Sequence, residues 1–279
     1  MVELKSFGNE GKVISCPAGK APEWFREMAL KSRAGIAHLF ILWGNIYDLQ
    51  RNMRGEYSSL YQYLAEIFEQ RDLIMFYSLS SGLQFASEEM DKLFRSKFLG
   101  ADLSTPASTG KQSPTQAAAK GLQQNQAANA PLGQLIGETP DKALRFLEKV
   151  LTDEVVMSLK SVLIVDFAQN IAPNQIGNQN ICDRISVEML ERWAKDCRIK
   201  ESGNTIVLIS PSLAGLAEGL RSPCGGAAAI RIPKPSEPER ISRWKYNQSS
   251  NGVVFSEGLT PESLGRITNG LSLKQIDSI

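Results

Sequence analysis

The sequence has few of the residues that build zinc centres and catalytic histidine sites. It contains one histidine, His38, and four cysteines without a Cys-x-x-Cys pair. Zinc sites need closely spaced Cys and His ligands, and a Ser–His or Cys–His pair needs a histidine with a suitably placed partner. His38 lies inside an apolar run without such a partner, so we interpret it as a buried structural histidine. The scattered cysteines indicate free thiols in a reducing compartment.

Long apolar runs and an excess of one charge are also lacking. No segment approaches the roughly 20 apolar residues that a membrane span needs, and the start MVELKSFGNEGKV has no apolar core behind a basic end. The 31 Lys and Arg residues nearly balance the 30 Asp and Glu residues, which leaves a net charge of +1. We therefore expect a folded cytoplasmic protein with no membrane partner and no nucleic-acid partner drawn by overall charge.

A phosphate-binding loop of the form GxxxxGK[ST] does not occur in the sequence. After the first apolar run, AHLFILW at 37–43, the chain continues GNIYDLQRN, with one glycine and no lysine. Lys20 in CPAGKAP follows no apolar strand, and Lys111 in STGKQS lies in low-complexity sequence. The backbone cradle that phosphate binding requires is therefore not expected at either place.

Several short apolar runs predict a mostly parallel sheet flanked by helices. Helical spacing of apolar residues at 57–70 separates the run at 37–43 from the next run at 72–79, and strand, helix, strand is typical of a parallel sheet. Further strands are predicted at 161–167, 204–210 and 228–233, and further helices at 21–33, from Thr139, and from Asp183 to Ile199.

The chain divides by composition into an arm, a domain with an insertion, and a C-terminal helical part. We place the arm at 1–33 and the α/β domain at 34–258. Residues 101–137 are rich in Ala, Gln, Ser and Thr and contain no aromatic residue, so a disordered insertion or linker is predicted there. Residues 259–279 predict two helices capped by Thr260 and Ser272, which would begin a helical lid.

Candidate ligand residues lie at the carboxyl ends of the predicted strands, where open α/β sheets bind their ligands. In ATPases an Asp at such a strand end holds magnesium, usually beside a Glu that polarises the attacking water. Asp166 occupies this position, but Phe167 follows it, and an Asp that only caps the turn is the alternative interpretation. Gly44 and Asn45 after the first strand are candidate cofactor contacts, and Ser210 ends the fourth strand.

Two further residues have competing interpretations. Arg221 precedes the last strand and is a candidate for reaching a phosphate on a neighbouring subunit, as arginine fingers do. The alternative is a surface arginine near a turn. Trp193 lies in an apolar stripe at helical spacing, which favours core packing over a ligand role.

The order of five segments resembles an AAA+ ATPase module followed from its first strand to its lid. These segments are LFILWGNIYDL, SVLIVDFAQNIAP, NTIVLISPSLAGLAEGLRS, IRIPKPSEPER and LTPESLGRITNGLSLKQIDSI. The resemblance covers 34–100 and 139–279. It implies a P-loop NTPase or RecA-like α/β fold, with a mostly parallel sheet flanked by helices and a partial C-terminal helical lid.

The motifs match this family residue by residue in some places and depart from it in others. SVLIVDF is similar to a Walker B strand that retains Asp166, and NTIVLIS is similar to a sensor-1 strand with Ser210 near the polar position. Arg240 stands at the family's arginine before the lid. Gly270, Ser272 and Ile276 match the lid pattern Gly-Phe-Ser-x-x-x-Ile. The Walker A loop, the Walker B glutamate and an evident sensor-2 arginine are missing.

Three functions follow from these observations. The resemblance implies a degenerate, non-hydrolysing first module of a tandem AAA protein, which would form homo- or hetero-oligomers and regulate an active AAA+ module in the same or another chain. The alternative is an enzyme that binds ATP or ADP with Mg at an atypical site formed by Asp166, Ser210 and a neighbour's Arg221. A third hypothesis is a DNA-associated regulator with basic contacts at Arg51, Arg54, Arg71 and Arg95. The sequence leaves open whether the chain is an enzyme.

Overall fold

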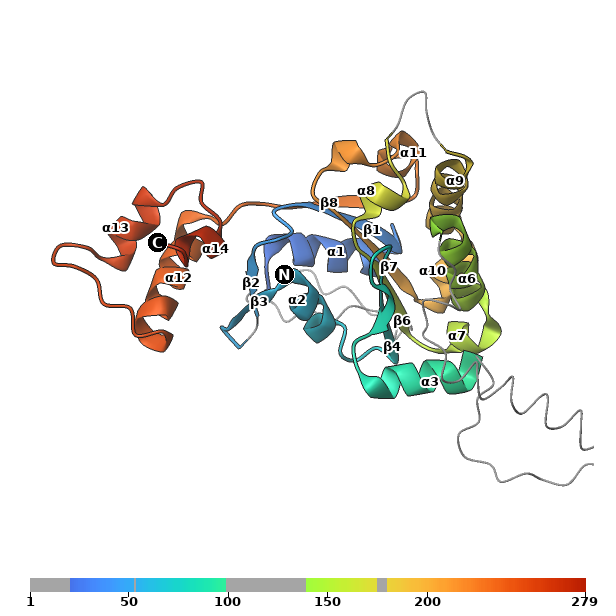
Figure 1. The fold of residues 1–279 in the computed structure, drawn as a ribbon, viewed down its shortest axis with the longest axis horizontal. Coiled ribbons are helices and arrows are strands. Elements are labelled where there is room, and N and C mark those ends of the chain that lie inside the picture. Colours follow the sequence, from blue (N-terminus) through green and yellow to red (C-terminus); the bar gives the residue numbers. More distant parts are fainter. Residues whose placement is uncertain (1–20, 53, 99–138, 175–179) are drawn as a thin grey trace, which may run out of the picture.

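The computed structural model describes residues 21–52, 54–98, 139–174 and 180–279 (Figure 1). The predicted insertion at 101–137, Lys20 and Lys111 lie outside the described residues, as does most of the predicted arm. None of the helices in the described ranges is long and apolar enough to cross a membrane.

The centre of the fold is a six-stranded sheet with the order β5-β4-β6-β7-β1-β8. Its neighbouring strands run parallel except for β5, which forms an antiparallel hairpin with β4. The strands are β1 (Leu39–Gly44), β4 (Leu73–Ser78), β5 (Gly82–Phe85), β6 (Ser161–Val165), β7 (Thr205–Ser210) and β8 (Ala228–Ile232). This confirms the predicted α/β fold class, and each predicted apolar run became a strand.

Helices cover both faces of the sheet and make it a three-layer structure (Figure 1). On one face lie α1 (Glu23–Arg33) and α2 (Leu60–Ile67). The other face is covered by α3 (Glu88–Phe98), α6 (Pro140–Thr152), α7 (Glu154–Ser158), α8 (Ala168–Ile171), α9 (Ile181–Lys195), α10 (Cys197–Ser202), η1 (Leu213–Gly215) and α11 (Glu218–Arg221).

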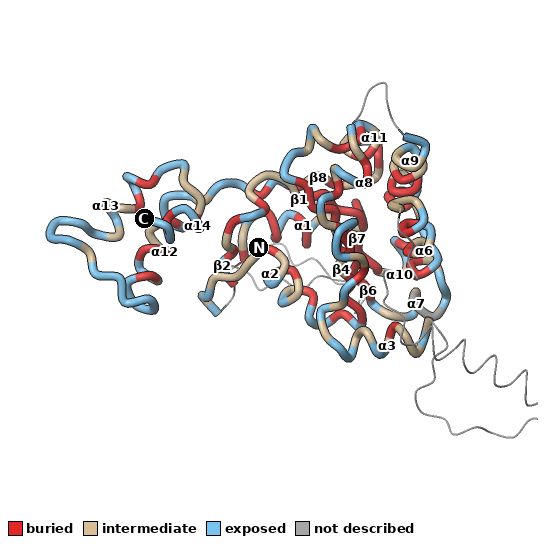
Figure 2. Tube along the Cα trace, in the orientation of Figure 1, coloured by how far each residue is buried: buried red, intermediate tan, exposed pale blue. Residues whose placement is uncertain are grey.

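The strands are buried on both faces, which explains their continuous apolar runs. In β1, Leu39 and Ile41 belong to the core under α6 and α9, whereas Phe40 and Leu42 belong to the core under α1 and α2. Successive side chains of a strand point to opposite faces, so an unbroken apolar run fills both layers at once. Figure 2 shows the resulting buried centre between exposed outer helix faces.

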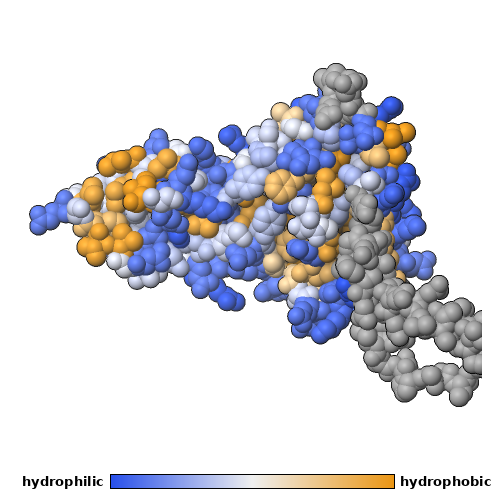
Figure 3. Space-filling view, in the orientation of Figure 1, coloured by the Kyte–Doolittle hydropathy of each residue, from blue (hydrophilic) through white to orange (hydrophobic). Residues whose placement is uncertain are grey.

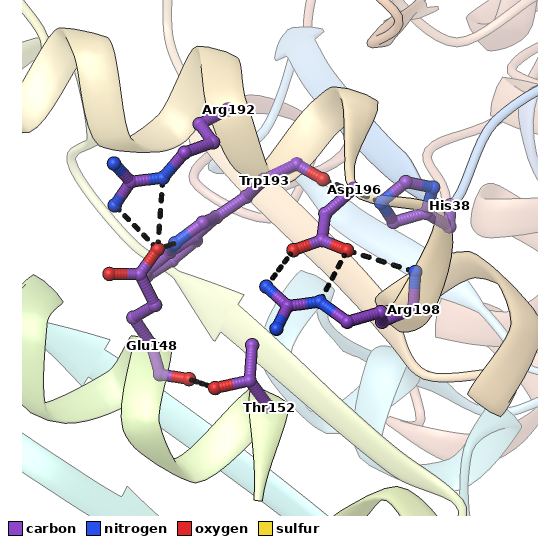
Figure 4. A network of polar contacts seen from close by, with 7 residues as sticks. All are labelled: His38, Glu148, Thr152, Arg192, Trp193, Asp196 and Arg198. Carbon is purple, nitrogen blue, oxygen red and sulfur yellow. Dashed lines mark hydrogen bonds and ion pairs between the residues drawn. The ribbon is translucent and has the colours of Figure 1, made fainter.

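Two of the helices that were predicted from apolar stripes are tied together by a polar contact. α6 and α9 are joined at Glu148, whose carboxylate accepts from Arg192 Nη2 at 2.6 Å and from Trp193 Nε1 at 3.2 Å (Figure 4). The Trp193 side chain is fully buried, as its position in an apolar stripe predicted. Its carbonyl oxygen lies 2.7 Å from Nε2 of His38 in the loop before β1.

Burial lowers the pKa of His38, against a smaller opposite effect of its hydrogen bond to the Trp193 carbonyl. The folded protein therefore favours the neutral imidazole. This agrees with a structural role for the histidine, because a buried neutral ring that donates to a backbone oxygen has its polar group satisfied.

A separate helical unit follows β8 and lies to one side of the sheet (Figure 1). It consists of α12 (Glu237–Ser250), α13 (Pro261–Ile267) and α14 (Leu273–Ile276). Trp244, Leu273 and Ile276 form its small core. We call residues 237–279 the helical unit. Between it and the sheet stands a two-stranded hairpin, β2 (Leu49–Arg51) and β3 (Tyr57–Ser59).

We expect stability to depend on pH through His38. Because its folded pKa lies below the ordinary value near 6.5, the unfolded chain binds the proton first, and the free energy of unfolding should fall as pH falls through and below 6.5. The slope should stay below about 1.4 kcal/mol per pH unit, the limit for one proton. Urea denaturation between pH 7.5 and pH 5.5 measures it. In His38→Gln, which retains a donor, the slope should be smaller; equal slopes would contradict the assignment.

Candidate functional site

The carboxyl ends of β1, β6 and β7 meet at one edge of the sheet, and this edge brings together four of the predicted site residues. Trp43 of β1 pairs with Ser210 of β7, and Val165 of β6 pairs with Leu208 of β7. Gly44, Asn45, Asp166 and Ser210 therefore lie at or just past the same edge, as predicted from their positions after apolar runs.

Gly44 is required here by a neighbouring strand. Its φ is +103°, and a Cβ at this position would stand 2.6 Å from the carbonyl oxygen of Ile232 at the end of β8. The next residue, Asn45, donates its backbone N–H to that same oxygen at 2.9 Å. The glycine thus allows the chain to leave β1 against the end of β8, and this approach explains it without a phosphate.

The connection from β1 to α2 is filled by the β2–β3 hairpin. Asn52 organises the hairpin turn, since its Oδ1 accepts from Arg54 N at 3.0 Å and from Glu56 N at 2.9 Å. At the start of α2, Ser59 and Gln62 form a capping box: Ser59 Oγ accepts from Gln62 N, and Gln62 Oε1 accepts from Ser59 N. The Gln62 amide at the start of α2 therefore already has an acceptor within the protein.

Asn45 and Asp48 tie this loop to the helical unit. Asn45 Nδ2 donates to Asp48 Oδ2 at 2.7 Å. The buried Asp48 carboxylate also accepts from the backbone N–H groups of Leu273 and Lys274, which begin α14. Sequence reasoning proposed Asn45 as a cofactor contact and missed Asp48. Two features of the sequence could have indicated Asp48. One is its position as an acidic residue between apolar neighbours, and the other is the Ser-x-x-Gln helix cap at 272–275, next to the amides that it binds.

Asp166 uses one oxygen in its own turn. Its Oδ1 accepts from Phe167 N at 2.7 Å, which is the turn-capping role that the sequence left as an alternative. Asp166 also lines a cavity of about 380 Å³ whose aromatic walls include Tyr61, Phe76 and Phe85. Burial, and after it the Asp166 carboxylate, raises the pKa of Tyr61; the same two causes raise that of Tyr47. The Tyr61 hydroxyl meets no partner at ordinary hydrogen-bond geometry, although Asp166 lies close enough to act on it.

Phe167, the residue where the resemblance to a Walker B strand would place a glutamate, has an unusual backbone. Its φ of +48° makes it the one non-glycine residue with positive φ in the described ranges, and its side chain is 38% exposed. Left-handed backbone at a bulky residue costs energy and is found mostly at special sites. Phe167 holds an apolar ring outward where hydrolysis would need a carboxylate.

These residues do not fit ATP with magnesium. The described connection after β1 forms the β2–β3 hairpin instead of a phosphate cradle, and the residue that follows Asp166 is Phe167, which has no carboxylate. Across the part of the chain that the structure describes, no three His, Cys, Asp or Glu side chains gather as a metal site. Asp166 alone retains a magnesium-type ligand, and two tyrosines lie near it.

Of the other predicted residues, Ser210 and Arg240 make hydrogen bonds within the fold, whereas Arg221 does not have a partner for its Nε among the described residues. Ser210 is fully buried and donates its hydroxyl to the carbonyl of Ser212 at 2.8 Å. Arg221 ends α11, and its Nε is buried without a partner among the described residues. Arg240 is buried and donates to the carbonyl oxygens of Gly265 at 2.9 Å and Pro235 at 2.6 Å, so it joins α12 to α13 and to the segment before α12.

The four arginines of the DNA hypothesis do not share one surface. Arg71 is buried and donates to the carbonyl of Gly203, and Arg95 pairs with Asp91 at 2.8 Å. Arg51 and Arg54 are exposed on the β2–β3 hairpin. A continuous track of cations along a phosphate backbone is therefore not formed by this set.

A second cleft of about 490 Å³ lies between α1, the hairpin and the segment that leads into α12. Its lining includes the cationic side chains Arg26, Arg51 and Lys234, together with the acidic side chains Glu23, Asp48 and Glu239. Lys234 Nζ already donates to the carbonyl of Gly270 at 2.8 Å. The cleft has mixed charge and opens beside the loop after β1.

A family model described as "AAA+ chaperone, N-terminal Rossmann-like domain" matches residues 16–233. The chain belongs to this family. The match to the AAA+ chaperone family ends at Pro233, where the chain leaves the sheet for α12, and it confirms the predicted AAA+ relationship. No curated protein matches the chain. A similar solved structure is titled "Structure of E. coli MS115-1 HORMA:CdnC:Trip13 complex", with 12% identity, a TM-score of 0.47, and coverage of 92% of this chain and 72% of that chain.

Substitution of Gly44 tests the close approach of β8 in this AAA+ domain. Gly44→Ala should lower the free energy of unfolding by about 3 kcal/mol or more, because it adds both backbone strain and a clash with the Ile232 carbonyl. The matched control is Gly258→Ala, where φ is +85° and nothing lies within 4 Å; it should cost only about 1 kcal/mol. If urea denaturation showed the same loss of unfolding free energy in both variants, the close approach of the Ile232 carbonyl would not be the reason for the glycine at position 44.

Proposed function

We propose that this AAA+ chaperone domain is a non-hydrolysing module that assembles with an active AAA+ ATPase module, in the same or another chain, and regulates it. The β2–β3 hairpin between β1 and α2 carries the proposal. It stands where a phosphate-binding turn would have to be, and the start of α2 is capped by Ser59 and Gln62. A module without that turn has no backbone cradle for the charges of a transferred phosphoryl group.

The edge residues support the same function. Phe167 cannot act as a general base, and Ser210 directs its hydroxyl into its own loop. A sheet that keeps the fold but lacks this chemistry is suited to respond mechanically to a neighbour that hydrolyses ATP. The described free thiols, Cys182, Cys197 and Cys224, support a reducing cytoplasm as its place of work.

Apolar surface on the helical unit supports an assembly role. Figure 3 shows apolar side chains gathered on this unit, at the left of the view. Its large exposed hydrophobic residues are Val253, Val254, Leu259, Ile267 and Ile279. Monomeric proteins rarely leave such patches uncovered, so we propose that another AAA+ module covers them in a homo- or hetero-oligomer.

Nucleotide titration tests the non-hydrolysing role. We expect millimolar ATP or ADP with magnesium to leave the melting temperature unchanged and ATP turnover to stay at the buffer level. A ligand at 100 times its Kd would instead add about 2.7 kcal/mol to the free energy of unfolding. Turnover that disappears in Asp166→Ala would overturn the proposal, and Asp72→Ala, at the opposite end of the sheet, is the control carboxylate.

The cleft beside the loop after β1 favours ATP binding as the second candidate function. Its three cationic side chains could contact phosphates if a nucleotide entered between α1 and the helical unit. A thermal shift with ATP that is lost in Arg26→Ala combined with Arg51→Ala, and retained in Asp166→Ala, would establish binding without hydrolysis at this cleft.

A further inference from the structure

Asp48 is a buried carboxylate that is held by N–H donors alone. It is 3% exposed, and none of the ion pairs between described residues includes it. Oδ1 accepts from Leu49 N at 2.9 Å and Lys274 N at 3.0 Å, whereas Oδ2 accepts from Asn45 Nδ2 at 2.7 Å and Leu273 N at 2.9 Å. An unpaired buried charge is tolerated only when its hydrogen bonds are complete, and these four bonds provide that.

The four donors come from two parts of the chain that the sequence separates widely. Asn45 and Leu49 flank Asp48 in the loop after β1. Leu273 and Lys274 are the first two residues of α14, in the helical unit. Ser272 Oγ caps the next free amide, that of Gln275, at 3.2 Å. The first amides of a helix have no partners within the helix and carry its partial positive charge, so a carboxylate binds them well.

The rest of the hairpin packs against the same unit. Leu49 and Tyr57 lie against the small core formed by Trp244, Leu273 and Ile276. The guanidinium of Arg243 lies 4.4 Å from the ring centroid of Tyr57 and pairs in two places with Asp277, at 2.8 and 2.6 Å. Cation–π contact and a bidentate ion pair are both strengthened by the burial of Arg243.

The hairpin is also fixed on its other side. Gln50 of β2 is buried and accepts from Trp24 Nε1 of α1 at 3.2 Å. Asn45 is held by its backbone to the end of β8. The loop after β1 and the hairpin therefore contact the sheet, α1, α12 and α14, which makes them the packed joint between the two parts of the molecule.

We propose that Asp48 and the β2–β3 hairpin act as an internal ligand that holds the helical unit in one orientation on the α/β domain without any nucleotide. The carboxylate supplies the negative charge at the start of α14, and the hairpin supplies the apolar and aromatic contacts beside it. This inference deepens the proposed non-hydrolysing function, because a unit fixed in this way transmits a neighbour's movement and does not respond to nucleotide of its own.

Asp48→Asn is the sharpest variant, because it preserves volume and removes the charge. Each carboxylate oxygen accepts two N–H groups, so an amide NH₂ at either position faces two donors that it cannot accept from. Hydrogen exchange followed by mass spectrometry, on the full chain without nucleotide, measures the result. We expect amides of α12 and α14 to exchange roughly tenfold faster or more, with the amides of β1, β6 and β7 unchanged.

Asp196→Asn is the matched control. Asp196 also caps a short helix, since it accepts from Arg198 N at 2.9 Å at the start of α10, but it lies in the α/β domain. This variant should speed exchange in α10 and leave the helical unit unaltered. Unchanged exchange of the helical unit in Asp48→Asn would overturn the proposal, as would equal acceleration in both variants.

The unsubstituted chain provides a test that does not depend on a variant's folding. The amides of Leu273 and Lys274 should be protected without nucleotide, and millimolar ATP with magnesium should change their exchange less than twofold. If these two amides exchanged fast until ATP was added, the proposal that Asp48 acts as an internal ligand would be wrong. ATP turnover with these amides already protected would instead refute the non-hydrolysing function and leave the role of Asp48 in place.

Discussion

A buried carboxylate must receive hydrogen bonds from every side, and Asp48 receives them from both parts of the molecule. Its oxygens bind the loop that leaves β1 and the first two amides of α14 at the same time. Loss of either set of donors would leave a buried charge with incomplete hydrogen bonds, which is more costly than the loss of an ordinary hydrogen bond. The position of the helical unit, the path of the β2–β3 hairpin and the close approach of Gly44 to β8 are all consistent with this requirement.

The sheet order explains why the joint forms at this place. β1 lies between β7 and β8, so the chain leaving its carboxyl end enters the edge where ligands bind in open α/β sheets. A Gly-rich turn there would present free amides to a phosphate. This chain instead places Asn45, Asp48 and a hairpin at that point, and the amides of Gln62 in α2 and of Leu273 and Lys274 in α14 find acceptors within the protein.

The sequence was sufficient to predict the five parallel strands of the sheet, and it was much less informative about the contacts between the sheet and the helical unit. Strands buried on both faces produce unbroken apolar runs, so β1, β4, β6, β7 and β8 were all predictable. β2, β3 and β5 have only three or four residues each and carry no such signal. The role of Asp48 depends on amides 225 and 226 residues away, which no local pattern reveals. Gly44 and Asn45 were placed at the right edge of the sheet, but their immediate contacts are to Ile232 and Asp48.

The fold and its chemistry rest on different residues in this AAA+ domain. Burial of whole strands in two apolar layers maintains the sheet, and few single polar residues at its edge affect that burial. Catalysis depends on a handful of side chains at such an edge, and Phe167, which follows Asp166 there, is not one of the apolar residues that bury β6. Asp48 is an exception to this division between core residues and edge residues, because its one polar side chain binds both the loop after β1 and the helical unit. A polar residue has a structural role when its hydrogen-bond partners lie on elements whose relative position is not fixed by apolar packing alone.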